Sequence, residues 1–252
     1  MLCFENVSVL RGRKTVLHNV NARIPKEKLT VIVGKNGSGK SSLLSCLTGL
    51  VRYTGKILLD GEDLSALSPR TRAQKCSLMP QLLPDTALTT RQLATLGREP
   101  YLAPGGKLSQ SDRETVENAI RFARMEDLQD TPVNRLSGGE RQRAFLAMAA
   151  AQNTPLVLFD EPTAHLDADH VGYFLQRVRA LADEQQKTAV LVLHDLTAAV
   201  NTADYLLVTD QNTCVFCGTK EEFLQQNMAQ SVFNLHQTAV CDPDGKERIL
   251  FY

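Results

Sequence analysis

The residues with the clearest chemical meaning are Lys40 and Ser41, which end the run Gly34-Lys35-Asn36-Gly37-Ser38-Gly39-Lys40-Ser41. This run has the G-x-x-x-x-G-K-[ST] spacing of a phosphate-binding P-loop. Its glycines allow the backbone to wrap, so that successive N–H groups point at one anion. We expect Lys40 to reach the β and γ phosphates of ATP and the Ser41 hydroxyl to ligate Mg²⁺.

The flanking pattern favours a P-loop over an ordinary glycine-rich turn. An apolar strand is expected at 29–33 and a helix at 42–50, with leucines at 43, 44, 47 and 50. The N-terminus of that helix would add free donors and a positive dipole end. The predicted ATP-binding residues are therefore the eight of the run together with Ser42.

A second candidate site follows the apolar run 156–159, which is typical of a strand buried on both faces of a parallel sheet. Asp160 and Glu161 end this strand. We expect Asp160 to hold Mg²⁺ and Glu161 to polarise the attacking water. The alternative is two solvated carboxylates at a strand end.

Composition limits the class of protein. The chain has 252 residues, enough for one large or two small domains, with 43% hydrophobic and 22% charged residues. Twenty-eight basic and 28 acidic residues give no net charge, so nothing draws the whole chain toward nucleic acid or acidic membranes. We see no apolar run long enough to span a bilayer and no secretory signal at the start, and we expect a cytosolic chain.

The six cysteines are scattered and do not form a disulfide framework. Cys214-Val-Phe-Cys217 has CxxC spacing without a second pair. Reduced structural thiols are the favoured interpretation, and a zinc site is the alternative.

The order of elements predicts an α/β fold. Two strands within 2–24 indicate an antiparallel layer beside a parallel core, and the helical period of 88–151 indicates an inserted helical subdomain. A helix capped by Ser68, a capping box from Thr219 to Glu222 and a hairpin over 238–252 are also expected. We place the catalytic core at 1–82 and 155–218, the helical subdomain at 83–154 and a C-terminal extension at 219–252.

The run Leu136-Ser137-Gly138-Gly139-Glu140-Arg141-Gln142-Arg143 resembles the signature motif of ABC ATPases. Other motifs of that family follow in order: Gln81 matches the Q-loop, Ala164-His165-Leu166-Asp167 the D-loop and His194 the switch histidine. The resemblance covers essentially the whole chain. It implies the ABC ATPase architecture, a RecA-like P-loop core with an antiparallel layer and a helical subdomain.

The signature also has a physical interpretation of its own. Ser137 is a good N-cap, and Gly138-Gly139 leaves N–H groups uncovered at a helix start, which makes a second phosphate cradle. In the resembled family, two subunits meet head to tail with two ATP molecules between P-loop and signature. The resemblance therefore implies a homodimer in which Ser137, Gly138, Gly139 and Asp167 contact the partner's ATP.

The resemblance assigns further roles. Glu161, His194 and Gln81 become the catalytic set, with His194 on the γ-phosphate, and Ser41, Gln81 and Asp160 become the Mg²⁺ ligands. One position departs from the family pattern: Arg11 stands where an aromatic residue usually stacks on adenine. A guanidinium plane can stack on a base, although a solvated turn arginine is an equal alternative.

The stretch Leu96-Gly97-Arg98-Glu99-Pro100-Tyr101, with Ser111-Asp112 and Val116 after it, resembles ATPases of iron–siderophore, haem and cobalamin importers. Tyr101 replaces their usual histidine. This implies permease subunits and a substrate-binding protein as partners, no nucleic acid, and a peripheral place on the cytoplasmic face of the inner membrane.

Three alternatives stay open. The first is an importer ATPase for another substrate, such as zinc or manganese. The second is a soluble ABC ATPase acting on nucleic acid or ribosomes, although such proteins typically carry paired nucleotide domains or coiled-coil arms. The third is a non-hydrolysing ATP-binding regulator, against which the intact Lys40, Asp160, Glu161 and His194 argue.

Overall fold

The computed structural model describes residues 1–252 except 13, 165, 243–244 and 246. The side chain of Arg11 is also not described. Two compact units make up the chain. One, here called the P-loop unit, consists of residues 1–66 and 188–252. The other, the signature unit, consists of residues 67–187.

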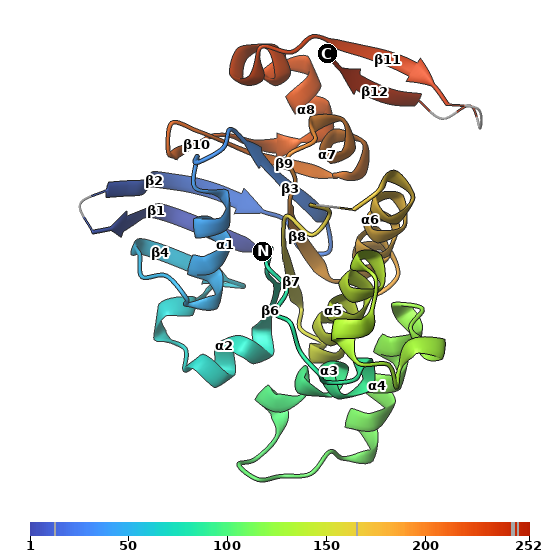
Figure 1. The fold of residues 1–252 in the computed structure, drawn as a ribbon. Coiled ribbons are helices and arrows are strands. Elements are labelled where there is room, and N and C mark those ends of the chain that lie inside the picture. The colour runs from blue at the N-terminus through green and yellow to red at the C-terminus, as the bar shows by residue number, and fades with distance from the viewer. Residues whose placement is uncertain (13, 165, 243–244, 246) are drawn as a thin grey trace. The chain divides into compact units, whose positions relative to one another are not determined.

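The P-loop unit contains two layers of strands (Figure 1). Its antiparallel sheet has the order β2-β1-β4-β5, and β10, β9, β3 and β8 lie side by side in that order. The elements are β1 (Leu2–Arg11), β2 (Lys14–Ile24), β3 (Leu29–Gly34), α1 (Lys40–Thr48), β4 (Thr54–Leu59), β5 (Glu62–Asp63), β8 (Thr188–Val192), α7 (Leu196–Thr202), β9 (Tyr205–Asp210), β10 (Thr213–Thr219), α8 (Lys220–Gln225), β11 (Gln237–Cys241) and β12 (Glu247–Phe251).

The strand β3 is the centre of this unit. It pairs in parallel with β8 on one side and β9 on the other, with Ile32 opposite Val192 and Leu207. All six of its residues are buried. A strand with both faces covered is largely apolar, which is why 29–33 is hydrophobic apart from the buried Thr30. The predicted antiparallel layer beside a parallel core is confirmed.

The helix after the P-loop differs from its prediction at both ends. It begins at Lys40 instead of residue 42 and ends at Thr48 instead of Leu50. Gly49 adopts φ 79° and its N–H bonds back to the carbonyl of Cys46, which closes the last turn. Leu50 therefore lies outside the helix and is 74% exposed.

The C-terminal hairpin, β11 with β12, is confirmed, although two of its predicted turn residues, Pro243 and Asp244, lie outside the described residues. The Asn201 side chain on α7 holds β12 by donating to the carbonyl of Ile249 at 2.7 Å and accepting from its N–H at 3.0 Å. The ring of Phe223 packs edge-on against Phe216 and Phe251, at centroid distances of 5.8 and 6.5 Å. These contacts anchor 219–252 within the P-loop unit.

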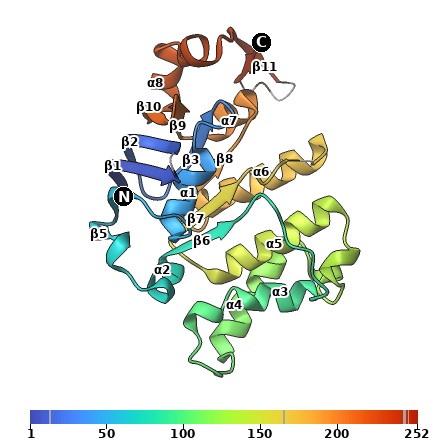
Figure 2. The same cartoon turned by 60° about the vertical axis from the view of Figure 1, so that its left-hand side comes forward.

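The signature unit joins a short parallel strand pair to a group of helices (Figure 2). Its elements are α2 (Pro69–Lys75), β6 (Cys76–Met79), α3 (Thr90–Leu96), α4 (Gln110–Phe122), α5 (Gly138–Gln152), β7 (Leu156–Asp160) and α6 (Ala168–Asp183), with 3₁₀ turns at Glu99–Tyr101, Glu126–Leu128 and Val133–Arg135. The caps at Ser68 and, in the other unit, Thr219 are confirmed, because each side chain accepts a backbone N–H of the first turn.

The importer-like stretch around Gly97 and Arg98 has a structural role in this unit. A Cβ on Gly97 would lie 2.5 Å from the carbonyl oxygen of Met148, so a glycine lets α3 approach α5 closely. Arg98 is 8% exposed, and its Nε donates to Asp112 at 3.0 Å while its Nη1 donates to the carbonyl of Ala151 at 2.9 Å. The Ser109 hydroxyl and the Arg98 guanidinium together hold the pKa of Asp112 below its usual value. One guanidinium thus ties α4 to the end of α5.

We expect Arg98→Met to lower the free energy of unfolding by about 3 kcal/mol, because it removes the cation paired with the Asp112 carboxylate and takes the Arg98 donor from the carbonyl of Ala151. Urea denaturation followed by circular dichroism measures this change. Arg179→Met is the matched control, since Arg179 forms an exposed i,i+4 pair with Asp183 and its loss should cost below about 0.5 kcal/mol. Equal losses in the two variants would contradict the structural role of Arg98.

Candidate functional site

The P-loop connects β3 to α1 and encloses the Lys40 side chain. Lys40 is 4% exposed, and its Nζ donates to the carbonyl of Gly34 at 2.9 Å and to that of Lys35 at 3.2 Å. The ammonium group therefore lies inside the loop that is predicted to hold the phosphates. Ser38 is also buried, and its hydroxyl lies 2.7 Å from that of Thr209 on β9.

Two glycines of the loop have no substitute. Gly39 has φ 99°, and a Cβ there would lie 2.3 Å from Cδ2 of Leu17 and 2.8 Å from the carbonyl oxygen of Val16. A Cβ on Gly34 would lie 2.2 Å from the carbonyl oxygen of Thr209. Gly37 has φ 79° but nothing within 4 Å of its Cβ position. The loop is thus fixed by packing at its two ends and open at its tip.

His194 lies at the same edge of the sheet as the P-loop. It follows β8, whose parallel pairing with β3 extends to the N–H of Leu193, which donates to the carbonyl of Ile32 at 3.2 Å. The carboxyl ends of parallel strands meet at one edge, so the exposed imidazole stands beside the strand end that carries the phosphate loop. The strand pairing brings together two segments that lie far apart in the printed sequence.

Gln81 and Glu161 form a pair in the signature unit. They follow β6 and β7, which pair in parallel with Met79 opposite Phe159. Gln81 Nε2 donates to Glu161 Oε2 at 2.6 Å. The amide nitrogen of Gln81 therefore faces the Glu161 carboxylate, and the amide oxygen of Gln81 faces away from that carboxylate. Asp160 is the last residue of β7, and Glu161 has φ 49°, so the chain leaves the sheet immediately after the two carboxylates.

The signature residues form the start of α5. Ser137 is the N-cap, and the structure adds a partner that the sequence reasoning missed: Glu140 completes a capping box. Glu140 accepts from the Ser137 hydroxyl at 2.7 Å and from its N–H at 2.8 Å. These bonds, the hydroxyl first, hold the pKa of Glu140 below its usual value. The S-x-x-E spacing was a usable signal for this cap.

Asp167 is the N-cap of α6, and it holds a second residue that the sequence reasoning missed, His170. Oδ1 of Asp167 accepts from the His170 N–H at 3.0 Å and lies 2.5 Å from its Nδ1. The His170 ring covers the second signature glycine: a Cβ on Gly139 would lie 2.2 Å from its Cδ2 and 2.6 Å from its Nε2. His165, of the predicted D-loop, lies outside the described residues.

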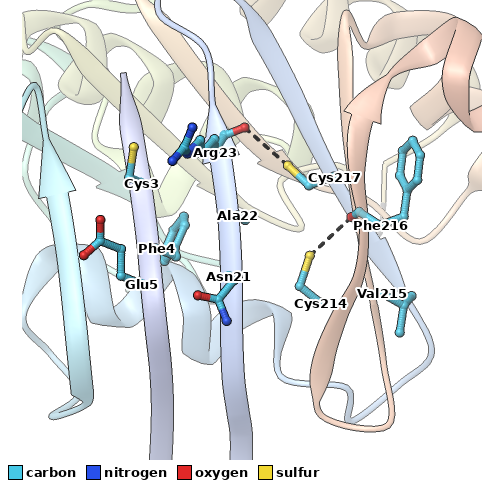
Figure 3. A pocket seen from close by; sticks show the side chains of 10 residues that line it. All are labelled: Cys3, Phe4, Glu5, Asn21, Ala22, Arg23, Cys214, Val215, Phe216 and Cys217. Atoms are coloured by element: carbon cyan, nitrogen blue, oxygen red, sulfur yellow. Dashed lines mark hydrogen bonds between the residues drawn. The ribbon is translucent and has the colours of Figure 1, made fainter.

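Two other predictions concern the P-loop unit. The backbone of Arg11 ends β1 opposite Lys14, but its side chain lies outside what the structure describes, so adenine stacking stays a prediction. All six cysteines are free. A bulge in β10 between Cys214 and Phe216 interrupts the alternation, and Figure 3 shows both thiols of the CxxC turned toward β2.

These thiols line a cavity of about 510 Å³ that also touches Cys3 and Arg23. Cys214 donates to the carbonyl of Phe216 and Cys217 to that of Arg23, each at 3.3 Å. Burial raises the pKa of Cys214 to about 12 and also raises that of Cys217. The pair is therefore held as protonated thiols that donate to backbone carbonyls.

Comparison with known proteins agrees with this geometry. The family model described as ABC transporter matches residues 17–164, which include the P-loop, the signature and the Asp160-Glu161 pair. The chain belongs to the ABC transporter family. ATP binding, and ATP hydrolysis coupled to transport, follow from this membership.

Several relatives cover nearly the whole chain. The achromobactin transport ATP-binding protein CbrD of Dickeya dadantii is 36% identical over 247 residues, covering 93% of this chain and 91% of the relative. The hemin import ATP-binding protein HmuV of Pseudomonas fluorescens is 36% identical over 251 residues, which cover 97% of this chain and 96% of the relative. The ferric enterobactin transport ATP-binding protein FepC of Escherichia coli is 32% identical over 241 residues, which cover 95% of this chain and 89% of the relative.

Solved structures share the fold. An inward-facing metal-chelate type ABC transporter matches with a TM-score of 0.85 at 23% identity, covering 100% of this chain and 97% of that one. An ATP-binding cassette solved as a dimer with ADP and Pi matches with a TM-score of 0.75 at 26% identity, and the match covers 87% of this chain and 99% of that one. The predicted ABC ATPase architecture is confirmed. Within the described part of the chain, we find no helix with the length and hydrophobicity of a membrane span.

We expect Gly39→Ala to lower the free energy of unfolding by about 2–5 kcal/mol and to abolish ATP binding, because the new Cβ combines a left-handed φ with overlap on Leu17. Gly37→Ala is the control, since it has the same backbone strain without overlap and should cost about 1–2 kcal/mol. Thermal unfolding and fluorescent ATP titration measure both effects. ATP affinity retained in Gly39→Ala would contradict the described loop geometry.

We expect Ser137→Ala to raise the pKa of Glu140 back toward its ordinary value, since the mutation removes the donor that contributes most to the depression. A depressed carboxyl pKa stabilises the fold above the unfolded-state pKa, and that contribution is lost as the pH falls through the folded-state value. The wild type should therefore lose stability more steeply than Ser137→Ala as the pH falls below about 4.5. Carboxyl NMR titration of Glu140 checks the shift directly, and an identical titration in both proteins would contradict it.

Proposed function

We propose that this chain is the ATPase subunit of an importer that takes up an iron complex (a siderophore or haem) or cobalamin. Two observations carry the proposal. The first is that Lys40 lies inside the P-loop and that Gln81 is paired with Glu161 after β6 and β7, and these are the groups that we assign to ATP binding and hydrolysis. The relatives that match nearly the whole chain are named for siderophore, hemin and enterobactin transport.

The proposed roles follow from the chemistry of each group. Backbone N–H groups of the P-loop and the Lys40 ammonium bind the β and γ phosphates. They stabilise the negative charge on the phosphate oxygens during cleavage, and no covalent intermediate with the protein is needed. Glu161 orients and polarises the attacking water, and His194 contacts the γ-phosphate from the strand next to β3. Ser42 and the loop residues from Gly34 to Ser41 complete the phosphate site.

Mg²⁺ fits the donors that these residues offer. It prefers hard oxygen ligands, and the proposed set consists of the Ser41 hydroxyl, the Asp160 carboxylate and the Gln81 amide oxygen. The hydrogen bond from Gln81 Nε2 to Glu161 supports this assignment, because it leaves the oxygen of the amide as the atom that can face a cation. Held by these residues, the ion would neutralise negative charge on the phosphates.

We further propose a head-to-tail homodimer. The N–H groups of Gly138, which is exposed, and of Gly139, which is buried, begin α5 after the Ser137 cap and would bind the γ-phosphate of a second copy's ATP, together with Ser137 and Asp167. A relative of the same fold has been solved as a dimer with ADP and Pi. ATP closes this dimer and hydrolysis reopens it, so each state can bind membrane permease subunits differently.

The proposed permease partners place the chain at the cytoplasmic face of the inner membrane, as a peripheral subunit, with a substrate-binding protein in the complex. Import of zinc or manganese by the same machinery is the second candidate. A role on nucleic acid or ribosomes is disfavoured by the balanced charge of the chain.

We expect Glu161→Gln to abolish ATP turnover, to leave ATP affinity within about threefold of wild type and to trap an ATP dimer, because binding groups remain while water activation is lost. Phosphate release and light scattering with ATP and Mg²⁺ measure these properties. Glu184→Gln, the same change at an exposed helix end, is the control and should behave as wild type. A Glu161→Gln protein that stays monomeric would count against the dimer.

Co-purification tests the substrate class. The tagged protein, isolated from its native membranes, should carry a many-spanning permease and a binding protein that retains an iron complex. Recovery of ribosomes or DNA-repair proteins without a membrane partner would overturn the transport role while leaving the ATPase intact.

A further inference from the structure

The imidazole of His170 stands on the signature turn, and no role has been assigned to it above. Its ring fills the space above Gly139 so closely that a Cβ there would lie 2.2, 2.6 and 2.9 Å from Cδ2, Nε2 and Cγ. Any side chain at 139 would displace the ring. The second glycine of the signature is therefore needed to make room for the imidazole.

The ring is held in one orientation by Asp167. Oδ1 of Asp167 caps α6 through the His170 N–H at 3.0 Å and also lies 2.5 Å from Nδ1. Because a carboxylate accepts hydrogen bonds, Nδ1 carries a proton and the opposite edge of the ring, with Nε2, faces the start of α5. The hydrogen bonds from His170 hold the pKa of Asp167 below its usual value, so this carboxylate is ionised near neutral pH.

Charged side chains of two helices surround His170. On its own helix it has Asp167 and Asp169, and on α5 it has Glu140 and Arg143. The Glu140 carboxylate is already bonded to Ser137, and the pKa of Glu140 is lowered by both Arg143 and His170. A protonated His170 would thus be balanced by two ionised carboxylates while its Nε2–H points at the turn of Gly138 and Gly139.

We propose that His170 is an additional phosphate-binding residue of the signature site, and that its protonated form strengthens the hold of this site on the ATP of a second copy. The proposal rests on the dimer proposed above. Neutral His170 presents a lone pair at Nε2, which repels a phosphate oxygen at the N-terminus of α5. Protonation replaces that lone pair with a charged donor and adds to the positive end of the helix dipole.

The test uses Glu161→Gln as the background, in which ATP should trap the dimer. Dimer dissociation constants are measured by analytical ultracentrifugation with ATP and Mg²⁺ at about pH 6 and pH 8, the range in which imidazoles change charge. With His170 present, the ATP dimer should be about tenfold tighter at the lower pH, the effect of one charge-assisted hydrogen bond. His170→Gln should give the weaker affinity at both pH values, and His170→Lys the tighter affinity at both.

His18→Gln is the matched control, because His18 is an exposed histidine of β2 in the P-loop unit, and it should keep the pH response. Circular dichroism and ATP affinity of the monomers establish that each variant is folded. A pH response that persists in His170→Gln overturns the inference and leaves the dimer standing. Absence of any ATP dimer in the Glu161→Gln background overturns the dimer proposal and this inference with it.

Discussion

The parallel pairing of buried strands is the constraint on which the chemistry of this protein depends. Parallel strands end at a common edge, so the residues that follow them meet whatever their distance along the chain. In the P-loop unit, the pairing of Ile32 with Val192 places His194 beside the phosphate loop. In the signature unit, the pairing of Met79 with Phe159 lets Gln81 donate to Glu161 at 2.6 Å. A slip of one residue in either register would move these side chains to the opposite face.

Helix caps are a second structural feature of the signature unit, and they bear on the proposed phosphate site as well as on stability. A capped helix start leaves N–H groups for an anion only when its first residues lack obstructing side chains. Gly138 has open space around its Cβ position, whereas Gly139 is covered by His170. The two signature glycines thus have different roles. Gly138 leaves the turn open, and Gly139 makes room for the imidazole of His170, which Asp167 holds in place.

The helical part of the signature unit shows how a substrate-class resemblance can have a structural cause. The Gly97-Arg98 stretch resembles that of iron-complex importers, yet the Arg98 side chain is buried in the unit, where it joins Asp112 to the end of α5. The resemblance of the Gly97-Arg98 stretch therefore has a structural cause, since both residues determine how the helices of the unit pack. No contact of these residues bears on the substrate class.

The sequence by itself determined the local elements whose causes are local. The P-loop spacing, the buried runs at 29–33 and 156–159, and the caps at Ser68, Ser137 and Thr219 depend on residues within a few positions of one another, and all appear as predicted. Only the tertiary structure decided which distant groups meet. It brought the ring of His170 onto Gly139 and the amide of Gln81 onto Glu161, and it turned both thiols of Cys214 and Cys217 to one side through a bulge in β10. The reason is that strand register, helix packing and bulges are set by the burial of many side chains together, and no short segment of the chain contains that information.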